Sequence, residues 1–352
     1  MFARAARVRR KGWKRYPGNA KRICTAIIRD CYDTKQHYFR TSTGHFCQFY
    51  ARDFGMCCES LLKRGYAKQV HATLEYALLH FSAANKITTA ITPDGVPFDY
   101  PRKGIDSLAF LIHALRMSKA KKLVKQHSAF LEGQIKEYAV LVRDCLIRDD
   151  VFLSSINDSI RRASACYDNC MLAMLNQDCT ILGLRHPFTT TKEHILKEFW
   201  NGEYFFEDRT KKSIVSGDAN VFPFWCGIIN DRALAKKVIA RLAKERLDSP
   251  FLLKYTTGQK HHDILATNLF AHNYEGDTVW GHLGLCYLDV LHTFDKKRFA
   301  QQLTAITKLV EHNQNFLEVF NADGTPYNTP FYYADEGMLW SAKLLGYLRG
   351  EA

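Results

Sequence analysis

The stretch DFGMCCESLL, residues 53–62, is an aspartate followed by a run of small and apolar residues. Five further segments repeat this arrangement without repeating the sequence. They are DSLAFLIHAL from Asp106, DNCMLAML from Asp168, DANVFPFWCGII from Asp218, DTVWGHLGLCYLDVL from Asp277 and DEGMLWSAKLLGYL from Asp335. Successive aspartates are 53, 62, 50, 59 and 58 residues apart. A period in the fifties, with an amphipathic segment between successive starts, predicts a helical-hairpin repeat.

Helical periodicity, with apolar residues at i, i+3, i+4 and i+7, is found in residues 66–85, 107–124, 127–146, 232–247 and 299–320. No comparable run alternates with the period of two that marks a half-buried strand. A helix that is apolar on most sides must be buried, whereas one with a charged stripe lies outside. Six helices of each kind close into two concentric rings. We therefore predict an all-α fold, an (α/α)6 barrel (six-hairpin toroid).

The 352 residues, 47% of them hydrophobic, are enough for one large core, and the net charge is +13. We expect residues 1–22 to form a basic N-terminal arm, because they carry nine Lys or Arg and no acid. The arm lacks the apolar run of a secretory signal, and a solvated arm is favoured over an Arg-rich transit segment. Residues 23–352 are expected to form a single barrel domain. The sequence contains no apolar run of 18 residues, which is the length that would indicate a membrane span.

Eleven cysteines, an odd number without a C-x-x-C motif, favour buried free thiols in a reducing compartment. We therefore expect a cytoplasmic protein. The histidine-rich residues 260–282 match no zinc spacing, so we expect no metal and no cofactor. The sequence also lacks a P-loop, a G-x-G-x-x-G and a G-x-S-x-G motif.

Each aspartate by itself can be explained as a helix cap. Asp is a favoured N-cap residue, and the helix dipole favours a negative charge at the N-terminus. If the N-terminal ends of all six inner helices meet at one end of the barrel, they would instead form a funnel lined by acids and aromatic residues. The loops between them are long, and long ordered loops are usually functional. Carboxylates and Arg bind sugar hydroxyls, and Trp and Tyr stack on sugar rings. Cleaving a glycosidic bond requires one protonated and one ionised carboxyl.

Three segments resemble the six-hairpin glycosidases, the clan of glucoamylases, amylo-1,6-glucosidases, trehalases and neutral invertases. FYARDFG (residues 49–55) resembles the aromatic-x-Arg-Asp motif of their first inner helix. FLEVFNADGTPYNTPFYYADEGMLWSAKLL (residues 316–345) resembles their closing segment, and NYEGDTVWGHLG (residues 273–284) is similar to their fifth-hairpin motif. The resemblance implies a glycosidase that cleaves a short, α-linked oligosaccharide or small glycoside by a two-carboxylate, inverting mechanism.

The resemblance also implies roles for individual residues. Glu318 would be the general base, and Asp53, assisted by Arg52, would hold sugar hydroxyls. The candidate general acid is Asp168, because partial desolvation beside Tyr167 would keep it protonated. Glu203 and Asp218 stay open as competitors, since the Trp-Glu-Glu sequence of glucoamylases is absent. Further candidate substrate contacts are Tyr100, Arg102, Asp106, Trp200, Tyr204, Asp277 and Trp280.

Two other functions stay open. The basic charge and the loop arginines would suit an anionic sugar, as in an uronyl hydrolase, a lyase or an epimerase built on the same barrel. A non-catalytic basic toroid that binds glycan or nucleic acid would instead show steep salt dependence. We expect a carbohydrate rather than nucleic acid as the partner, and the sequence does not indicate an oligomeric state.

Overall fold

The computed structural model describes residues 2–100, 102–151, 153, 156–258 and 270–348. The first part of the histidine-rich stretch, residues 260–269, lies outside the described residues. The expectation that this part binds no metal is therefore not addressed by the structure.

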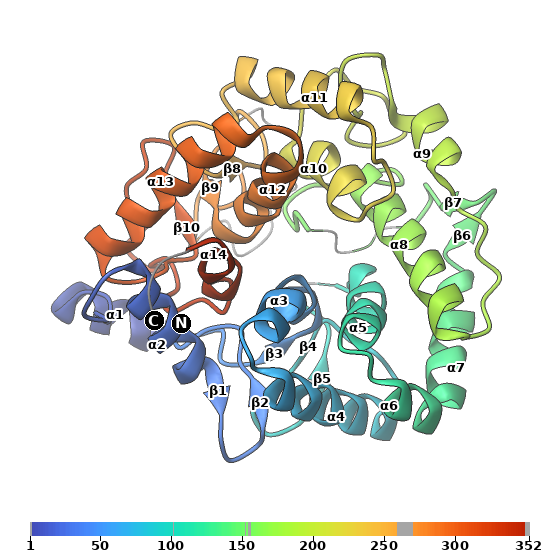
Figure 1. The fold of residues 1–352 in the computed structure, drawn as a ribbon, viewed down its shortest axis with the longest axis horizontal. Coiled ribbons are helices and arrows are strands. Elements are labelled where there is room, and N and C mark those ends of the chain that lie inside the picture. The colour runs from blue at the N-terminus through green and yellow to red at the C-terminus, as the bar shows by residue number, and fades with distance from the viewer. Residues whose placement is uncertain (1, 101, 152, 154–155, 259–269, 349–352) are drawn as a thin grey trace.

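The described helices form two concentric rings (Figure 1). The inner ring contains α3 (Ala51–Lys63), α5 (Asp106–Met117), α8 (Cys166–Leu182), α10 (Gly217–Trp225), α12 (Gly281–Phe294) and α14 (Ser341–Tyr347). The outer ring contains α2 (Ala20–Cys31), α4 (Ala67–Ala83), α7 (Ser128–Ala139), α9 (Lys192–Phe199), α11 (Arg232–Lys244) and α13 (Lys296–Asn313). Two further helices are α1 (Phe2–Lys11) and α6 (Lys121–Gln126). The predicted (α/α)6 barrel is confirmed.

The difference between the two rings follows from their sequences. In α8 every residue from Cys166 to Leu175 is buried, so the helix has no solvent-facing side over that length. In α11 the buried residues recur on one side only, at Ala235, Val238, Ile239 and Leu242. The opposite side of α11 carries its lysines and arginines. A helix buried all round belongs to the inner ring, and a helix with one apolar stripe belongs to the outer ring.

Helix capping does not account for the six repeated aspartates. Asp53, Asp106, Asp168 and Asp218 lie in the first turns of their helices. Asp277 and Asp335 come before α12 and α14. The N-cap positions are instead occupied by Tyr50, Ile105, Ala165, Ser216, Trp280 and Trp340, which make no side-chain cap hydrogen bond. The carboxyl groups are therefore committed to other contacts.

Short antiparallel strands lie in the loops, where the sequence predicted none. The described strands are β1 (Tyr32–Asp33), β2 (Tyr38–Phe39), β3 (Phe49–Tyr50), β4 (Ala90–Ile91), β5 (Pro97–Phe98), β6 (Val142–Arg143), β7 (Leu146–Ile147), β8 (Leu253–Lys254), β9 (Val279–Trp280) and β10 (Val319–Phe320). They pair in the orders β1-β2, β3-β4-β5, β6-β7 and β10-β9-β8. Because β3 leads directly into α3 and β9 into α12, these sheets fix the loops at the N-terminal ends of the inner helices.

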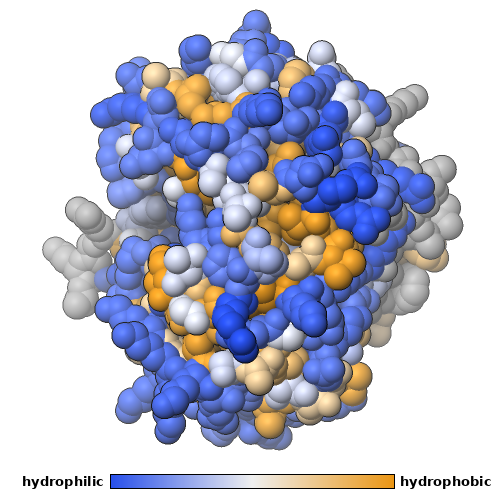
Figure 2. Space-filling view, turned by 90° about the vertical axis from the view of Figure 1, so that its right-hand side faces the viewer, coloured by the Kyte–Doolittle hydropathy of each residue, from blue (hydrophilic) through white to orange (hydrophobic). Residues whose placement is uncertain are grey.

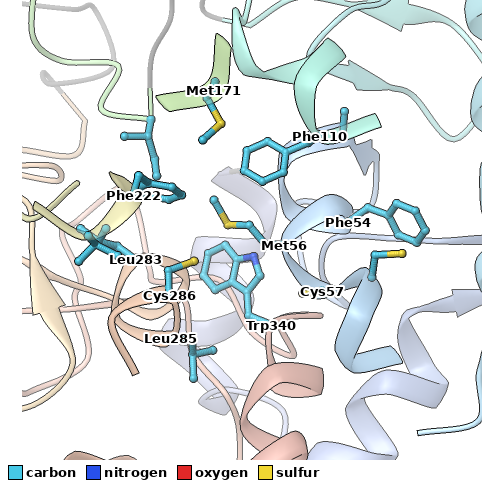
Figure 3. Packing of buried hydrophobic residues seen from close by; sticks show 14 of the residues in the cluster. Phe54, Met56, Cys57, Phe110, Met171, Phe222, Leu283, Leu285, Cys286 and Trp340 are labelled. Atoms are coloured by element: carbon cyan, nitrogen blue, oxygen red, sulfur yellow. The ribbon is translucent and has the colours of Figure 1, made fainter. Parts of the chain in front are cut away.

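Side chains of the inner helices fill the axis of the barrel. Figure 3 shows side chains from different inner helices converging on the indole of Trp340. The labelled residues around it include Met56, Phe110, Met171, Phe222, Leu283 and Cys286, all of them buried. The barrel is thus closed by a packed apolar plug, and a ligand can enter only from one end or the other.

The basic N-terminal segment folds against the barrel, which corrects the expectation of a solvated arm for this part. Ala5 and Val8 of α1 are buried, and Trp13 packs against the core. The Trp13 indole donates to the Ala334 carbonyl oxygen at 2.9 Å. The residues that the N-terminal segment contacts here, Tyr333 and Ala334, lie more than 300 residues away in the sequence. A count of positive charges could not reveal these contacts.

The outer surface on the side of α7, β6 and β7 is largely hydrophilic, with smaller apolar patches between the charged residues (Figure 2). No helix among the described residues is long and apolar enough to cross a membrane. All eleven cysteines are free, and most are buried. The cytoplasmic location stays a prediction.

Candidate active site

A cavity of about 130 Å³ lies at the N-terminal ends of the inner helices. Four carboxyl groups among the described residues line it, those of Asp53, Asp158, Glu275 and Glu318. Its aromatic walls are Phe46, Tyr50, Tyr100, Tyr255, Tyr274, Trp280 and Trp340. The cavity thus combines acids with aromatic faces, but of the six repeated aspartates expected at this mouth Asp53 alone lines it.

Glu318 is held rigidly in this cavity. Its Oε2 accepts hydrogen bonds from the Tyr332 hydroxyl at 2.7 Å and from the Asp335 backbone N–H at 2.9 Å. The Tyr274 hydroxyl donates to Oε1. Burial raises the pKa of Glu318, and the charge of Asp335 adds to this, while His45 and the Tyr274 hydrogen bond oppose it. A carboxylate so held can accept a proton without changing its position.

Asp158 and Glu275 face the cavity as a pair. Glu275 accepts hydrogen bonds from the backbone N–H groups of Asp158 at 3.2 Å and Ser159 at 2.8 Å, and from the Ser159 hydroxyl. Burial, and then the charge of Asp158, raise the pKa of Glu275. Two carboxyls this close resist being ionised together, so the pair retains one proton to a higher pH than a lone carboxyl would.

Asp53 and Arg52 form a second polar wall. The Trp340 indole donates to Asp53 Oδ1 at 2.7 Å, and burial raises the pKa of Asp53 to about 6. Arg52 Nε donates to Asp106 Oδ2 at 2.6 Å. Asp106 also accepts from the Tyr167 hydroxyl at 2.6 Å and is fully buried. Asp106 therefore orients Arg52 from behind and does not itself line the cavity.

His282 offers a neutral polar group to the same space. Burial lowers the pKa of His282 to about 3, so the ring is uncharged near neutral pH. Its Nε2 lies 2.9 Å from the Tyr255 hydroxyl. Its Nδ1 is buried and has no hydrogen-bond partner among the described residues. A sugar hydroxyl could satisfy this atom.

The structure brings five of the predicted site residues together at the cavity and places six others away from it. Glu318, Arg52, Asp53, Tyr100 and Trp280 line the cavity. The six that do not line it are Asp168, Arg102, Asp106, Trp200, Tyr204 and Asp277.

Contacts explain several of these placements. Asp168 is buried on α8, and its charge acts on the Tyr138 phenol of the outer helix α7, whose pKa is raised by burial and by this charge. Trp200 packs against Phe205, with ring centroids 4.9 Å apart. Tyr204 lies beneath the Arg241 guanidinium at 5.0 Å. The aromatic residues of this loop thus pack within the outer layer of the barrel.

The two competing acids are also engaged elsewhere. Glu203 is exposed and pairs with Arg241 at 2.8 Å. Asp218 is fully buried and pairs with Arg162, which also binds Glu207. Neither lines the cavity.

Sequence reasoning missed Asp158, Glu275, Tyr274 and His282. Asp158 lies in the loop before α8, ten residues upstream of Asp168, and no apolar helix follows it directly. Glu275 and Tyr274 belong to the NYEGD sequence of the quoted fifth-hairpin motif. That motif was therefore the available signal, although only Asp277 and Trp280 were taken from it.

A larger cavity of about 760 Å³ lies at the C-terminal ends of the inner helices. The partly exposed Asp289 accepts from the Trp225 indole at 2.8 Å, from the Tyr347 hydroxyl at 2.7 Å and from Lys343. The other carboxyl among the described lining residues, Glu59, is exposed and pairs with Lys63 at 2.8 Å, so this end lacks a buried carboxyl beside Asp289. Among the described residues no cluster of His, Cys, Asp or Glu is arranged to hold a metal ion.

The sequence matches no protein-family model and no curated protein. The structure is similar to that of a rhamnosidase from Klebsiella oxytoca with rhamnose bound, with a TM-score of 0.66 and 11% identity over 95% of this chain and 65% of that one. It is also similar to a GH63 mannosylglycerate hydrolase from Thermus thermophilus in complex with Tris and D-glycerate, with a TM-score of 0.62 and 12% identity over 94% and 100% of the two chains. A bacterial glucoamylase complexed with acarbose has a TM-score of 0.64 and 10% identity over 92% and 54%. The chain therefore spans just under two thirds of the rhamnosidase and about half of the glucoamylase. It has the (α/α)6-barrel fold of these glycosidases.

Proposed function

We propose that the protein is a glycoside hydrolase that removes one terminal sugar from a short, α-linked oligosaccharide or small glycoside, with inversion at the anomeric carbon. The observation that carries this proposal is the pairing of two differently held carboxyl sites in one aromatic cavity. Glu318 is fixed by two tyrosines and a backbone amide, whereas burial and the nearby charge of Asp158 raise the pKa of Glu275. That difference supplies the base and the acid of the reaction.

The lining of the cavity supports action on a terminal sugar. Carboxyl groups that can hold hydroxyls, Asp53 and Glu318, line it together with the aromatic faces of Trp280 and Trp340. The rest of the substrate would then lie toward the mouth, where the half-exposed Tyr100 offers an aromatic face.

Asp158 is the proposed general acid, in place of the sequence candidate Asp168. It donates the proton retained by its pair with Glu275 to the glycosidic oxygen as the bond from that oxygen to the anomeric carbon breaks. The proton leaves with the departing alcohol, so Asp158 ends ionised. The buried environment keeps bulk water from supplying this proton instead.

Glu318 is the proposed general base. It accepts a proton from a water molecule as the water oxygen bonds to the anomeric carbon from the opposite side. Asp158 gives up a proton and Glu318 gains one, so a proton exchange with solvent restores the site. Asp53, Arg52 and His282 would hold the hydroxyls of the terminal sugar.

The charges of the cavity favour a neutral sugar over an anionic one. Among the described lining residues, Arg52 is the one Arg or Lys and pairs with Asp106, whereas four carboxyls face the space. A sugar carboxylate would meet like charges from these four acids. This opposes the uronyl hydrolase, lyase and epimerase alternative, although the net charge of the whole chain is +13.

A panel of trehalose, maltose, isomaltose, sucrose and glucosylglycerate tests the proposal. We expect at least one to be hydrolysed, and Asp158→Asn and Glu318→Gln each to lower kcat by about a hundredfold or more. Glu203→Gln, an exposed acid outside the cavity, is the matched control and should leave kcat unchanged. Loss of activity in Asp168→Asn with retained activity in Asp158→Asn would reverse the assignment of the acid. No hydrolysis of any α-linked or β-linked glycoside would refute the function.

A further inference from the structure

Several contacts of the basic N-terminal segment fall on one short stretch of the chain, residues 333–336. The Arg4 guanidinium donates to the carbonyl oxygens of Tyr333 at 2.8 Å and Ala334 at 2.9 Å. Its Nε lies 3.1 Å from Asp335 Oδ1 and 3.5 Å from Glu336 Oε1. One arginine thus reaches four consecutive residues.

Two neighbouring groups strengthen this contact. Arg7 pairs with Glu336, and the Lys14 backbone N–H donates to Glu336 Oε2 at 2.6 Å. Glu336 is almost fully buried, and so is Asp335. Buried carboxylates with charge-assisted partners are far more constrained than exposed ion pairs.

The stretch that α1 contacts also forms hydrogen bonds with Glu318. The Asp335 N–H donates to the Glu318 carboxylate at 2.9 Å, and the Asp335 carbonyl oxygen accepts from the Glu318 N–H at 3.0 Å. The Tyr332 hydroxyl donates to the same carboxylate at 2.7 Å. Glu318 is therefore one residue removed from the contacts of Arg4.

The Asp335 side chain ties this stretch to the wall of the cavity. It accepts from the backbone N–H groups of His45 and Phe46, each at 3.0 Å, and from the Ser42 hydroxyl. Burial alone would raise the pKa of Asp335, but His45, Arg4 and Ser42 together hold it at about 2. Asp335 thus stays ionised, and Arg4 supplies part of its compensating charge.

We propose that the N-terminal helix α1 is a clamp for the general base, with Arg4 as the positioning residue that fixes residues 333–336 and, through them, the Glu318 carboxylate. This inference rests on the proposed function for its catalytic consequence. The geometric part of it concerns the order of residues 333–336 and stands independently of any substrate.

A purely stabilising role is the simpler explanation, but the contacts favour the clamp. Of the described side chains of α1, only Ala5 and Val8 are buried, so the helix adds little apolar area to the core. Most of its polar contacts converge on residues 330–336 rather than spreading over the barrel. Geometry matters here because a misplacement of about 1 Å can cost roughly a hundredfold in rate.

The test compares Arg4→Ala, Arg4→Lys and Arg10→Ala in the full chain, on the disaccharide that the wild type hydrolyses best. Arg10 is exposed on the same helix and, among the described residues, bonds the Ala6 carbonyl oxygen of its own helix, so it is the matched control. We expect Arg4→Ala to lower kcat by roughly tenfold to a hundredfold with KM within about twofold. Arg4→Lys should recover part of the rate, because Lys keeps the charge but not the fork that reaches two carbonyls.

The pH profile provides a readout that a structural role would not move. The groups that face the Glu318 carboxylate are Tyr274, Tyr332, His45 and Asp335, with the cavity acids beyond them. Without Arg4 the charge of Asp335 is less compensated, so ionising Glu318 becomes harder. The acidic limb of kcat/KM should therefore move to higher pH in Arg4→Ala and stay in place in Arg10→Ala.

Hydrogen exchange separates the clamp from the function. Peptides covering residues 330–338 should exchange faster in Arg4→Ala than in the wild type and Arg10→Ala. Unchanged exchange there, or an unchanged kcat and acidic limb in an active enzyme, would overturn the clamp. If the wild type hydrolyses no glycoside while exchange rises as expected, the proposed function fails and the geometric part of the clamp holds.

Discussion

Asp158 and Glu275 show how a pair of like residues can acquire different roles from their hydrogen bonds. Glu275 accepts from two backbone N–H groups and a hydroxyl, which favour its ionised form. Burial and the charge of Asp158 nevertheless raise the pKa of Glu275, so the pair retains one proton, which we propose reaches the substrate through Asp158. A like-charged neighbour thus keeps a proton within the pair, as an apolar pocket keeps one on other general acids.

Replacing Glu275 should therefore alter the proton donor without removing it. We predict that Glu275→Gln moves the alkaline limb of the kcat/KM profile to lower pH. The amide keeps the size of the side chain but not its charge, so Asp158 loses its proton more readily. The measurement is a profile of initial rates against pH. An alkaline limb at the wild-type position would show that Glu275 does not hold the proton on Asp158.

Residues in recognisable motifs were predictable, and those in irregular loops were not. Asp53 and Glu318 lie in stretches that resemble known motifs, and both line the cavity. Asp168 was chosen because an apolar helix follows it. A buried helix has side chains pointing in all directions, however, and Asp168 acts on Tyr138 of the outer layer. Sequence spacing identifies the helix but not the direction of a side chain in its first turn.

At the scale of elements, the loop that carries Asp158 is anchored by a buried ion triad. Arg162 Nη2 lies 3.3 Å from Asp218 Oδ1, and the same guanidinium also binds Asp218 Oδ2 and Glu207. Asp218 belongs to α10, so the triad ties the loop before α8 to the next inner helix. All three side chains are buried.

Removing the arginine should leave two carboxylates buried without a partner. We predict that Arg162→Met lowers the free energy of unfolding by about 3–5 kcal/mol near neutral pH, measured by urea denaturation. Arg161→Met, at the exposed neighbouring position, should cost much less. Equal losses for the two variants would argue against the triad as an anchor.

The order of helices could be read from periodicity, whereas several ends and all strands could not. The sixth inner helix was expected from Asp335 but begins at Ser341. Residues 335–338 are instead irregular, with isolated bridges from Glu336 to Leu317 and from Met338 to Ser42, and Asp335 accepts from the backbone N–H groups of residues 45 and 46. Similarly, the helical pattern of residues 127–146 ends at Ala139 and continues into the hairpin of β6 and β7. A two-residue strand is too short to show alternation.

At the scale of the whole molecule, the net charge of the chain is positive, whereas the charged side chains that line the candidate active site are mostly acidic. The chain is basic overall, yet four acids line the cavity among its described residues. Part of the basic excess is used in the contacts of α1 with Asp335 and Glu336. Net charge therefore described the surface and the N-terminal segment, and it gave no information about the site.

The barrel also has two cavities at opposite ends, separated by the apolar plug around Trp340. We predict that the monosaccharide released by the enzyme slows hydrogen exchange in residues 273–282 and 316–320. Residues 289–294, at the larger cavity, should be unaffected, because ligand protection is confined to the site that binds. Protection of residues 289–294 alone would place the sugar site at the other end.

The most direct test of the central claim is the anomer released in the first minutes of hydrolysis, followed by proton NMR. If Glu318 activates water opposite the bond protonated by Asp158, an α-linked substrate should release the β-anomer first, and Glu318→Gln should abolish the signal. The α-anomer as first product would contradict the account, because the incoming oxygen would then have entered from the side of the departing group.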